Sequence, residues 1–320
     1  MKTYATLGPA CCEKEIIAEM LSDGLTGFRL NLSHTTLPQC APWIYALHEA
    51  EDSCGKKAEL IIDMRGGEIR IGQLAYPFPL RQGDTVELGK DIPVDDDILS
   101  ALKPGLTLLL DDGAMELTVL SADGKCRVER GGMLGSRKSL SGIDLTRPAV
   151  SPEDHDDMAL ARLYGVTGIM HPFVRSRSDL LQVRQAMAQH GLDCLTLFAK
   201  VEDAQGLATL PDWLELADVI TVARGDLGTN LPLWELPRAQ KKISALCKDA
   251  GKPFLVVTQL LHSMIDHSGP TRAEVSDIYN ACLDGASALM LTNETAQGSY
   301  GADAVRWLIR VAAEGEKDRR

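Results

Sequence analysis

Residues 197–203 form a short apolar run that ends in charged side chains: Leu197-Phe198-Ala199-Lys200-Val201-Glu202-Asp203. The run has the length of a buried strand, and a helix start is expected at Asp203. Side chains two residues apart in a strand share a face, so Lys200 and Glu202 point to the same place. A second run of this kind also ends in an acid: Val219-Ile220-Thr221-Val222-Ala223-Arg224-Gly225-Asp226. One lysine and two carboxylates at the ends of neighbouring strands can hold a divalent cation together with an anionic group.

Similar strand-like runs alternate with amphipathic stretches on both sides of this region. Eight strands are expected, in the segments Thr3–Leu7, Gly27–Ser33, Ala58–Met64, Thr167–Phe173, Thr196–Val201, Val219–Ala223, Phe254–Thr258 and Ala288–Leu291. The connections contain helical segments and are short enough for right-handed βα units. Eight such units close into a barrel of about 250 residues, so an α/β fold of the (β/α)8 TIM-barrel type is predicted. A doubly wound open sheet is the weaker alternative, because no GxGxxG pattern follows the first strand.

The interval from about Ile71 to Leu145 has a different pattern. Short alternating runs are separated there by turn signals such as Gln82-Gly83-Asp84 and Asp123-Gly124-Lys125. This pattern predicts a small all-β insertion, and Asp95-Asp96-Asp97 is expected to be a solvated loop within it. The predicted division is therefore a first barrel part at 1–70, a β-rich lid at 71–145 and a second barrel part at 146–320.

Composition excludes several classes of protein. The chain has 320 residues, of which 45% are hydrophobic, and a formal net charge of -12, which argues against general binding to nucleic acid or anionic membranes. No apolar run approaches the roughly 20 residues of a membrane span, and the first residues are too polar for a signal peptide. The eight cysteines are scattered without a CxxC pair, so free thiols in a cytoplasmic protein are expected rather than a zinc site.

Active sites of (β/α)8 barrels are built where the strands run into the following loops. Those ends carry cations, acids and neutral oxygen or amide groups: Arg29, Asn31, Ser33, Asp63, Arg65, Arg70, His171, Arg175, Lys200, Glu202, Arg224, Asp226, Thr258, Thr292, Asn293 and Glu294. Several cations around two acids suit a phosphorylated acid held on a metal ion. Any one of these residues alone is more often a solvated loop residue, but their joint placement relies on independent strands.

A series of motifs runs along nearly the whole chain. They are Thr6-Leu7-Gly8-Pro9-Ala10, Arg29-Leu30-Asn31-Leu32-Ser33-His34, Asp63–Gly66, Glu68-Ile69-Arg70, Asp111-Asp112-Gly113, Gly131–Lys138, Pro148–Ser151, Lys200-Val201-Glu202, Ala223–Gly228, Gly251-Lys252-Pro253, Thr258-Gln259, Pro270–Glu274 and Asn293-Glu294-Thr295. Together, and in this order, they resemble the pyruvate kinase family. The resemblance implies a barrel with a β-rich lid that transfers the phosphoryl group of phosphoenolpyruvate to ADP, giving pyruvate and ATP through an enolate.

The resemblance also implies roles for individual residues. Glu202 and Asp226 look like the ligands of Mg²⁺ or Mn²⁺. The positions that match catalytic residues are Lys200, Arg70, Arg29 and Thr258. Lys200 and Arg70 would lie at the transferring phosphoryl group, and Thr258 near the proton delivered to the enolate. The backbone of Ala223, Arg224, Gly225 and Asp226, with Thr258, would hold the substrate carboxylate.

The nucleotide and potassium sites are implied in the same way. The positions that would face the nucleotide are Arg29, Asn31, His34 and Lys138. Asn31, Ser33, Asp63 and the carbonyl of Met64 match the family's K⁺ site, and Glu68 matches its potassium-dependent branch. The implied partners are a small anionic substrate, either phosphoenolpyruvate or another 2-oxo acid, and an adenine nucleotide. Neither nucleic acid nor a membrane is implied, and a homo-oligomer is left open.

Some positions depart from the family pattern. Met64-Arg65-Gly66-Gly67 stands where the family has Thr-Lys-Gly-Pro, Pro172 replaces a small polar residue, Thr35 replaces a glycine, and Thr292-Asn293 replaces Ser-Gly. The resemblance stops after the eighth helix, which is the expectation for a short form without the family's C-terminal regulatory domain. Two alternatives stay open: a metal-dependent carbon–carbon lyase, aldolase or decarboxylase acting on a 2-oxo acid, and a non-catalytic binding protein on the same barrel.

Overall fold

The computed structural model describes every residue except Glu68, Asp112, Asp144, Thr146 and Arg320, and only the backbone of His34. Its contacts separate the chain into two compact units. The first unit consists of Met1–Gly66 and Ala149–Arg320, and the second of Gly67–Pro148. The sequence pattern predicts the corresponding limits at 70/71 and 145/146.

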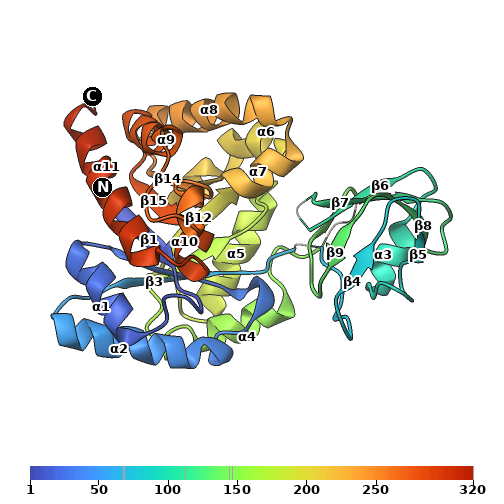
Figure 1. The fold of residues 1–320 in the computed structure, drawn as a ribbon, viewed down its shortest axis with the longest axis horizontal. Helices are drawn as coiled ribbons and strands as arrows, with labels where there is room; N and C mark the ends of the chain where they lie inside the picture. The colour runs from blue at the N-terminus through green and yellow to red at the C-terminus, as the bar shows by residue number, and fades with distance from the viewer. Residues whose placement is uncertain (68, 112, 144, 146, 320) are drawn as a thin grey trace. The chain divides into compact units, whose positions relative to one another are not determined.

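The first unit contains a closed barrel of eight parallel strands (Figure 1). The strands are β1 (Lys2–Thr6), β2 (Gly27–Asn31), β3 (Glu59–Asp63), β11 (Gly168–His171), β12 (Thr196–Val201), β13 (Val219–Ala223), β14 (Phe254–Val257) and β15 (Ala288–Leu291). They pair in the order β1-β15-β14-β13-β12-β11-β3-β2, which returns to β1. The predicted (β/α)8 fold is thereby confirmed.

Helices surround these strands. They are α1 (Lys14–Asp23), α2 (Ala41–Cys54), α4 (Pro152–Leu160), α5 (Arg177–Gln189), α6 (Ala204–Trp213), α7 (Arg224–Asn230), α8 (Leu236–Asp249), α9 (Arg272–Leu283), α10 (Asn293–Ala296) and α11 (Gly301–Lys317), with short 3-10 turns η1 (Leu32–His34), η2 (Pro38–Cys40), η3 (Leu214–Leu216), η4 (Leu233–Glu235) and η5 (His262–Ile265). Capping boxes at Ser151, Ser176 and Thr271 start three of the helices. Among the described residues, no helix is both long and apolar enough to span a membrane.

The period-two alternation of each strand divides its side chains between two cores. In β12, Leu197, Ala199 and Val201 belong to the large core between strands and helices, whereas Phe198 belongs to the smaller core inside the barrel. Lys200 therefore shares the inner face with Phe198 and lies one layer nearer the C-terminal end of the strand. The inner core of apolar side chains therefore lies directly beneath Lys200.

The second unit is mainly β-structure. Its strands are β4 (Phe78–Leu80), β5 (Thr85–Glu87), β6 (Thr107–Leu110), β7 (Met115–Val119), β8 (Lys125–Arg130), β9 (Gly132–Leu134) and β10 (Leu140–Ser141), which form one sheet in the order β10-β6-β7-β8-β5 and a separate pair, β4-β9. The prediction that Asp95-Asp96-Asp97 is a loop was wrong. Asp96 begins helix α3 (Asp96–Ala101), with both Asp96 and Asp97 in its first turn. Acidic side chains are favourable there because the helix dipole is positive at its N-terminus.

Candidate active site

Four charged side chains from three strands meet at the C-terminal end of the barrel. The Lys200 Nζ lies 3.0 Å from Oε1 of Glu202 and 3.2 Å from both carboxylate oxygens of Asp63. On its other side Asp63 accepts hydrogen bonds from Arg29, at 2.6 Å from Nη2 and 2.9 Å from Nε. Asp63 and Glu202 are each 1% exposed. We call Arg29, Asp63, Lys200 and Glu202 the strand-end cluster.

Backbone pairing and register hold this cluster in place. β2 and β3 align Asn31 with Asp63, and β12 and β13 align Lys200 with Thr221. The second oxygen of Glu202 accepts a 2.7 Å hydrogen bond from the backbone N–H of Phe173, in the loop after β11. Phe173 has a φ of 47°, a left-handed conformation that is uncommon for a bulky residue. The orientation of Glu202 is thus set by a strained loop as well as by its own strand.

The electrostatics of the strand-end cluster depend on competition between burial and pairing. Burial alone would lower the pKa of Lys200, but the neighbouring Asp63 and Glu202 outweigh it and the pKa is raised. Burial raises the pKa of Glu202, Lys200 opposes that rise, and Asp226 and Asp63 add to it. For Asp63, the penalty of burial is overcome by Lys200 and Arg29, and its pKa is lowered. Lys200 therefore stays protonated. The negative charge of the buried Glu202, by contrast, is only partly offset by Lys200.

The chemistry of this donor set fits a divalent cation. Glu202 and Asp226 act electrostatically on each other and on Lys200, so two carboxylates share one neighbourhood. Because Asp226 raises the pKa of Glu202, a hard dication that takes carboxylate oxygens would relieve the repulsion between them. Asp226 lies in the first turn of α7, and the side-chain amide of Asn230, at the end of that helix, donates to the carbonyls of both Glu202 and Asp226.

The segment Ala223–Asp226 joins the end of β13 to the start of α7. The guanidinium of Arg224 is engaged elsewhere, because it donates twice to the Thr258 carbonyl, at 2.7 and 3.1 Å, and pairs with Asp277 at 2.6 Å. At Gly225 a Cβ atom would lie only 3.1 Å from Cγ2 of Thr258, so a side chain there would crowd the end of β14. The glycine lets α7 begin directly against Thr258.

Thr258 and Gln259 follow β14 in an unusual backbone conformation. Their φ values are 79° and 56°, and a β-branched residue such as threonine rarely adopts a positive φ. Two consecutive residues of this kind are found where the surrounding structure holds them, most often at functional sites. The two hydrogen bonds from Arg224 to the Thr258 carbonyl provide that restraint.

The oxygen donors predicted for a monovalent cation lie at the ends of β2 and β3. The Asn31 Oδ1 accepts the backbone N–H of Ser33 at 3.2 Å, which closes the turn η1. The Asp63 Oδ1 is buried and accepts no hydrogen bond within the part of the chain that the structure describes, although the Lys200 Nζ lies 3.2 Å away. An incompletely satisfied anionic oxygen at the end of a strand that pairs with the strand of Asn31 fits a site for a weakly hydrated cation.

Other predicted site residues lie elsewhere or cannot be described. Arg70 and Lys138 belong to the second unit, where the Arg70 guanidinium donates to the Arg137 carbonyl at 2.8 Å and Lys138 pairs with Asp111 at 2.7 Å. Glu68 and the side chain of His34 are outside the described residues. Arg175, in the segment between β11 and α5, pairs with Asp203 at 2.6 Å and therefore supports the loops around the site.

His171, which the sequence places at a strand end, is buried, its Nδ1 has no hydrogen-bond partner among the described residues, and burial lowers its pKa to about 4. Two acids near the barrel end were not predicted from the sequence. Asp154 and Asp157 of α4 bind the backbone and side chain of Arg65. The Ser151-Pro152-Glu153-Asp154 sequence signals a helix start, but nothing in it signals a contact with a residue 89 positions earlier.

Comparison with known proteins places the chain among characterised sequences. The family model for the barrel domain of pyruvate kinase matches residues 1–305. A pyruvate kinase of Corynebacterium efficiens is 36% identical over 340 residues, covering 100% of this chain and 70% of that protein. One of Aeropyrum pernix is 36% identical over 326 residues, covering 99% and 71%. A cytosolic isozyme of pyruvate kinase from Nicotiana tabacum is 36% identical over 338 residues, covering 98% and 66%.

The fold and the strand-end cluster define an enzyme of the (β/α)8-barrel class, with its charged groups gathered at the C-terminal ends of the strands. The sequence relationships are more specific. The chain belongs to the pyruvate kinase family, as its motifs indicated.

Proposed function

We propose that this chain transfers the phosphoryl group of phosphoenolpyruvate to ADP, giving pyruvate and ATP, with Mg²⁺ or Mn²⁺ and K⁺ as cofactors. The observation that carries the proposal is the strand-end cluster, in which Lys200 contacts both Asp63 and Glu202 within 3.2 Å. Membership of the pyruvate kinase family supports the same reaction.

Glu202 and Asp226 would bind the divalent cation. When bound, that cation supplies positive charge to the phosphoryl and enolate oxygens of the substrate. Lys200 is held on the same strand as Glu202, two residues away, and stays protonated because Asp63 and Glu202 raise its pKa. It can therefore neutralise charge on the transferring phosphoryl group, where positioning and electrostatics dominate catalysis. Arg29 orients Asp63 and adds a second cation at the same place.

The substrate carboxylate and the proton would be handled on the other side of the site. Backbone groups of Ala223, Arg224, Gly225 and Asp226 would receive the carboxylate, because the Arg224 side chain is turned away toward Asp277. Thr258, next to Gly225, would lie beside the carbon that accepts the proton. Its strained backbone supports this role, since such conformations persist where function requires a fixed direction.

The remaining roles rest on the family resemblance together with local geometry. Asn31, Ser33, Asp63 and the carbonyl of Met64 would bind K⁺, and the buried, incompletely satisfied Asp63 Oδ1 supports this assignment. The nucleotide would be bound by Arg29, Asn31, His34 and Lys138. The role of Arg70 at the phosphoryl group rests on the family resemblance alone. The cytosolic location of the tobacco relative supports a cytoplasmic location for this chain.

A coupled assay tests the proposal. Purified protein with phosphoenolpyruvate, ADP, Mg²⁺ and K⁺ is expected to form pyruvate and ATP in equal amounts. Pyruvate formation that does not require ADP would instead indicate a carbon–carbon lyase or another reaction of a 2-oxo acid. No ADP-dependent pyruvate above a no-enzyme control would overturn the proposal.

A further inference from the structure

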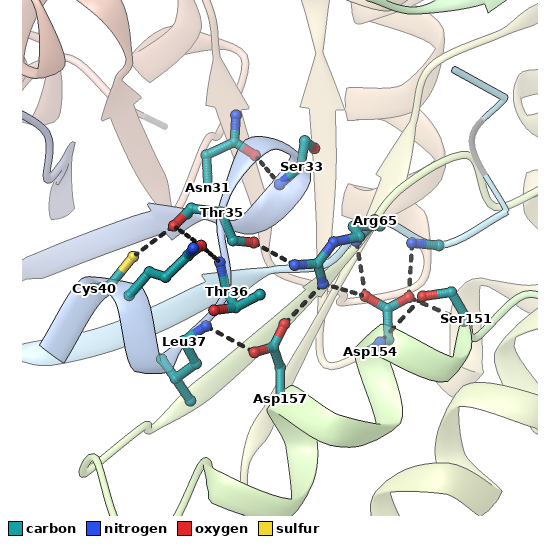
Figure 2. Close-up of polar contacts among 12 residues, drawn as sticks. Asn31, Ser33, Thr35, Thr36, Leu37, Cys40, Arg65, Ser151, Asp154 and Asp157 are labelled. Carbon is teal, nitrogen blue, oxygen red and sulfur yellow. Dashed lines mark hydrogen bonds and ion pairs between the residues drawn. The ribbon is translucent and has the colours of Figure 1, made fainter. Parts of the chain in front are cut away.

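A second buried cluster lies below the turn that follows β2, and Figure 2 shows its contacts. The Arg65 guanidinium donates to the backbone carbonyl of Thr35 and pairs with Oδ2 of Asp157 at 2.7 Å. The Asp154 Oδ1 lies 3.7 Å from the same guanidinium. The Arg65 side chain is only 18% exposed, and the side chains of both acids are almost fully buried. We call Arg65, Asp154 and Asp157 the root cluster.

Asp154 also holds the backbone on both sides of the passage between the two units. It accepts the N–H groups of Arg65 and Gly66 at 2.9 Å each, just before the chain leaves the barrel after Gly66. It accepts the N–H of Ser151 at 3.1 Å, two residues after the chain re-enters at Ala149. One carboxylate thus binds the chain where it leaves the barrel unit and where it returns.

These contacts fix the peptide between Met64 and Arg65. A trans peptide is planar, and its N–H and C=O point in opposite directions. Because the Arg65 N–H is directed at Asp154, the direction of the Met64 carbonyl is determined as well. That carbonyl is one of the oxygens proposed to bind K⁺.

The side chain of Arg65 acts on the opposite side of the same proposed site. Asn31 and Ser33 are part of the turn η1 and its cap, which Thr35 ends by donating its N–H to the Leu32 carbonyl. Arg65 binds the Thr35 carbonyl, and Asp157, which Arg65 neutralises, accepts the Leu37 N–H at 2.7 Å. The turn that presents Asn31 and Ser33 is therefore tied to α4 through one guanidinium.

We propose that Arg65 is a positioning residue for the monovalent cation, because it links the Asn31–Ser33 turn and the Met64 carbonyl to the same buried carboxylates. This inference rests on the proposed function, which places K⁺ against those oxygens. Arginine suits the task, since its planar fork presents five donors to acceptors on different elements. A lysine carries its three donors on one nitrogen, so in this chain it cannot bind the Thr35 carbonyl and Asp157 in the same planar geometry.

Arg65→Lys tests the inference while keeping the buried charge. The K⁺ concentration for half-maximal activation is expected to rise roughly tenfold, the size typical of changes to residues that orient metal ligands, with a smaller change in kcat at saturating K⁺. The stabilisation of the protein by KCl over tetramethylammonium chloride, measured as a shift in thermal midpoint at equal ionic strength, is expected to shrink in parallel. This second readout does not depend on catalysis.

Arg184→Lys is the matched control. Arg184 also donates to a carbonyl, that of Leu216 at 2.8 and 3.0 Å, and pairs with Asp218 at 3.0 Å, but these residues precede β13 at the opposite end of the strands. It is expected to lose stability without any change in the response to K⁺. Should Arg65→Lys fail to fold, Asp157→Asn replaces it, since asparagine still accepts the Leu37 N–H but removes the ion pair.

The outcomes separate the inference from the proposed function. An unchanged K⁺ response in Arg65→Lys, or one matched by Arg184→Lys, would overturn the positioning role. Wild-type pyruvate formation that is indifferent to K⁺ would overturn it too and leave the kinase proposal standing. If no pyruvate forms but KCl stabilises the wild type specifically and Arg65→Lys does not respond, the positioning role is supported and the kinase proposal is rejected.

Discussion

Both clusters are buried and contain two acids. The strand-end cluster pairs them with Arg29 and Lys200, and the root cluster pairs them with Arg65, yet the acids are held in different ways. In the root cluster, backbone N–H groups meet the carboxylates: Asp154 accepts from Arg65, Gly66 and Ser151, and Asp157 accepts from Leu37. In the strand-end cluster, Asp63 is met by the side chains of Arg29 and Lys200, and one of its oxygens accepts no hydrogen bond among the described residues.

The kind of donor that meets each buried carboxylate indicates whether the cluster has a structural or a functional role. Backbone donors are fixed by the fold and cannot exchange partners, so the root cluster rigidifies the loops that it joins. Long side chains from independent strands can give up one partner for a metal ion or a phosphoryl group. The strand-end cluster is therefore suited to exchange its partners during a reaction, whereas the root cluster is suited to hold the surrounding backbone.

Lys200→Met removes the central cation of the strand-end cluster and has the largest expected effect. We expect turnover to fall by on the order of 10³-fold or more, because the substitution removes a preorganised cation from the transferring group. The affinities for Mn²⁺ and oxalate, measured by calorimetry, are expected to change little. A parallel loss of binding and turnover would mean that Lys200 acts on the ground state.

Glu202→Gln addresses the proposed metal ligand. We expect Mn²⁺ affinity to fall roughly 100-fold, because a buried carboxylate is exchanged for a neutral amide. Burial raises the pKa of Glu202, so protons compete with the metal ion as the pH falls. Stabilisation of the wild type by Mg²⁺ is therefore expected to be larger at about pH 8.5 than at about pH 6. In Glu202→Gln this pH dependence should disappear; its persistence would assign it to another group.

In the metal-free protein, ionisation of Glu202 is expected to lower stability as the pH rises, the opposite of its effect on stabilisation by Mg²⁺. The raised pKa of Glu202 means that the unfolded chain ionises this group at a lower pH than the folded chain does. The charged form thus costs the folded state stability as the pH rises from the ordinary glutamate pKa through the raised one. Glu202→Gln is expected to reduce that loss when thermal midpoints are compared without metal at the two pH values.

Asp154→Ala tests the structural side of the comparison. We expect the free energy of unfolding to fall by about 3–5 kcal/mol, because three backbone N–H groups and part of the Arg65 charge lose a buried acceptor. Asp303→Ala is the control, since its half-exposed pair with Arg306 on α11 is worth at most about 1 kcal/mol. Urea denaturation of both variants measures the two losses in free energy of unfolding. Equal losses would mean that the buried contacts of Asp154 do not stabilise the protein more than an exposed ion pair does.

Gly225→Ala has the smallest expected effect. Its Cβ would approach the Thr258 Cγ2 to 3.1 Å, so α7 and the end of β14 must move apart by a few tenths of an ångström. We expect kcat/KM for phosphoenolpyruvate to fall roughly tenfold, because small displacements of positioning groups are costly. Gly269→Ala has open space around its Cβ and is expected to leave the kinetics unchanged.

The sequence predicts the barrel well because period-two alternation and strand-end charges are local signals. The alternation in residues 197–203 places Phe198 in the barrel interior and Lys200 beside Glu202, which is where the structure has them. The error at Asp95-Asp96-Asp97 arose because aspartate is common both in loops and in the first turn of helices.

The parts that could not be predicted depend on long-range contacts. No local pattern marks Arg65 as a partner of Thr35 and Asp157, since these residues are brought together only when β2, β3 and α4 pack. The departure from the family's lysine at this position could be read from the sequence, but its consequence could not. The positive φ values at Phe173, Thr258 and Gln259 are likewise imposed by tertiary structure on residues that do not favour them.

The central claim is that Lys200, Glu202 and Asp226 surround one anion held on a divalent cation. Anomalous scattering from crystals grown with Mn²⁺ and oxalate tests it most directly. We expect one manganese peak within bonding distance of carboxylate oxygens of both Glu202 and Asp226, with oxalate between it and Lys200. A manganese ion bound elsewhere, with these carboxylates unliganded, would contradict it.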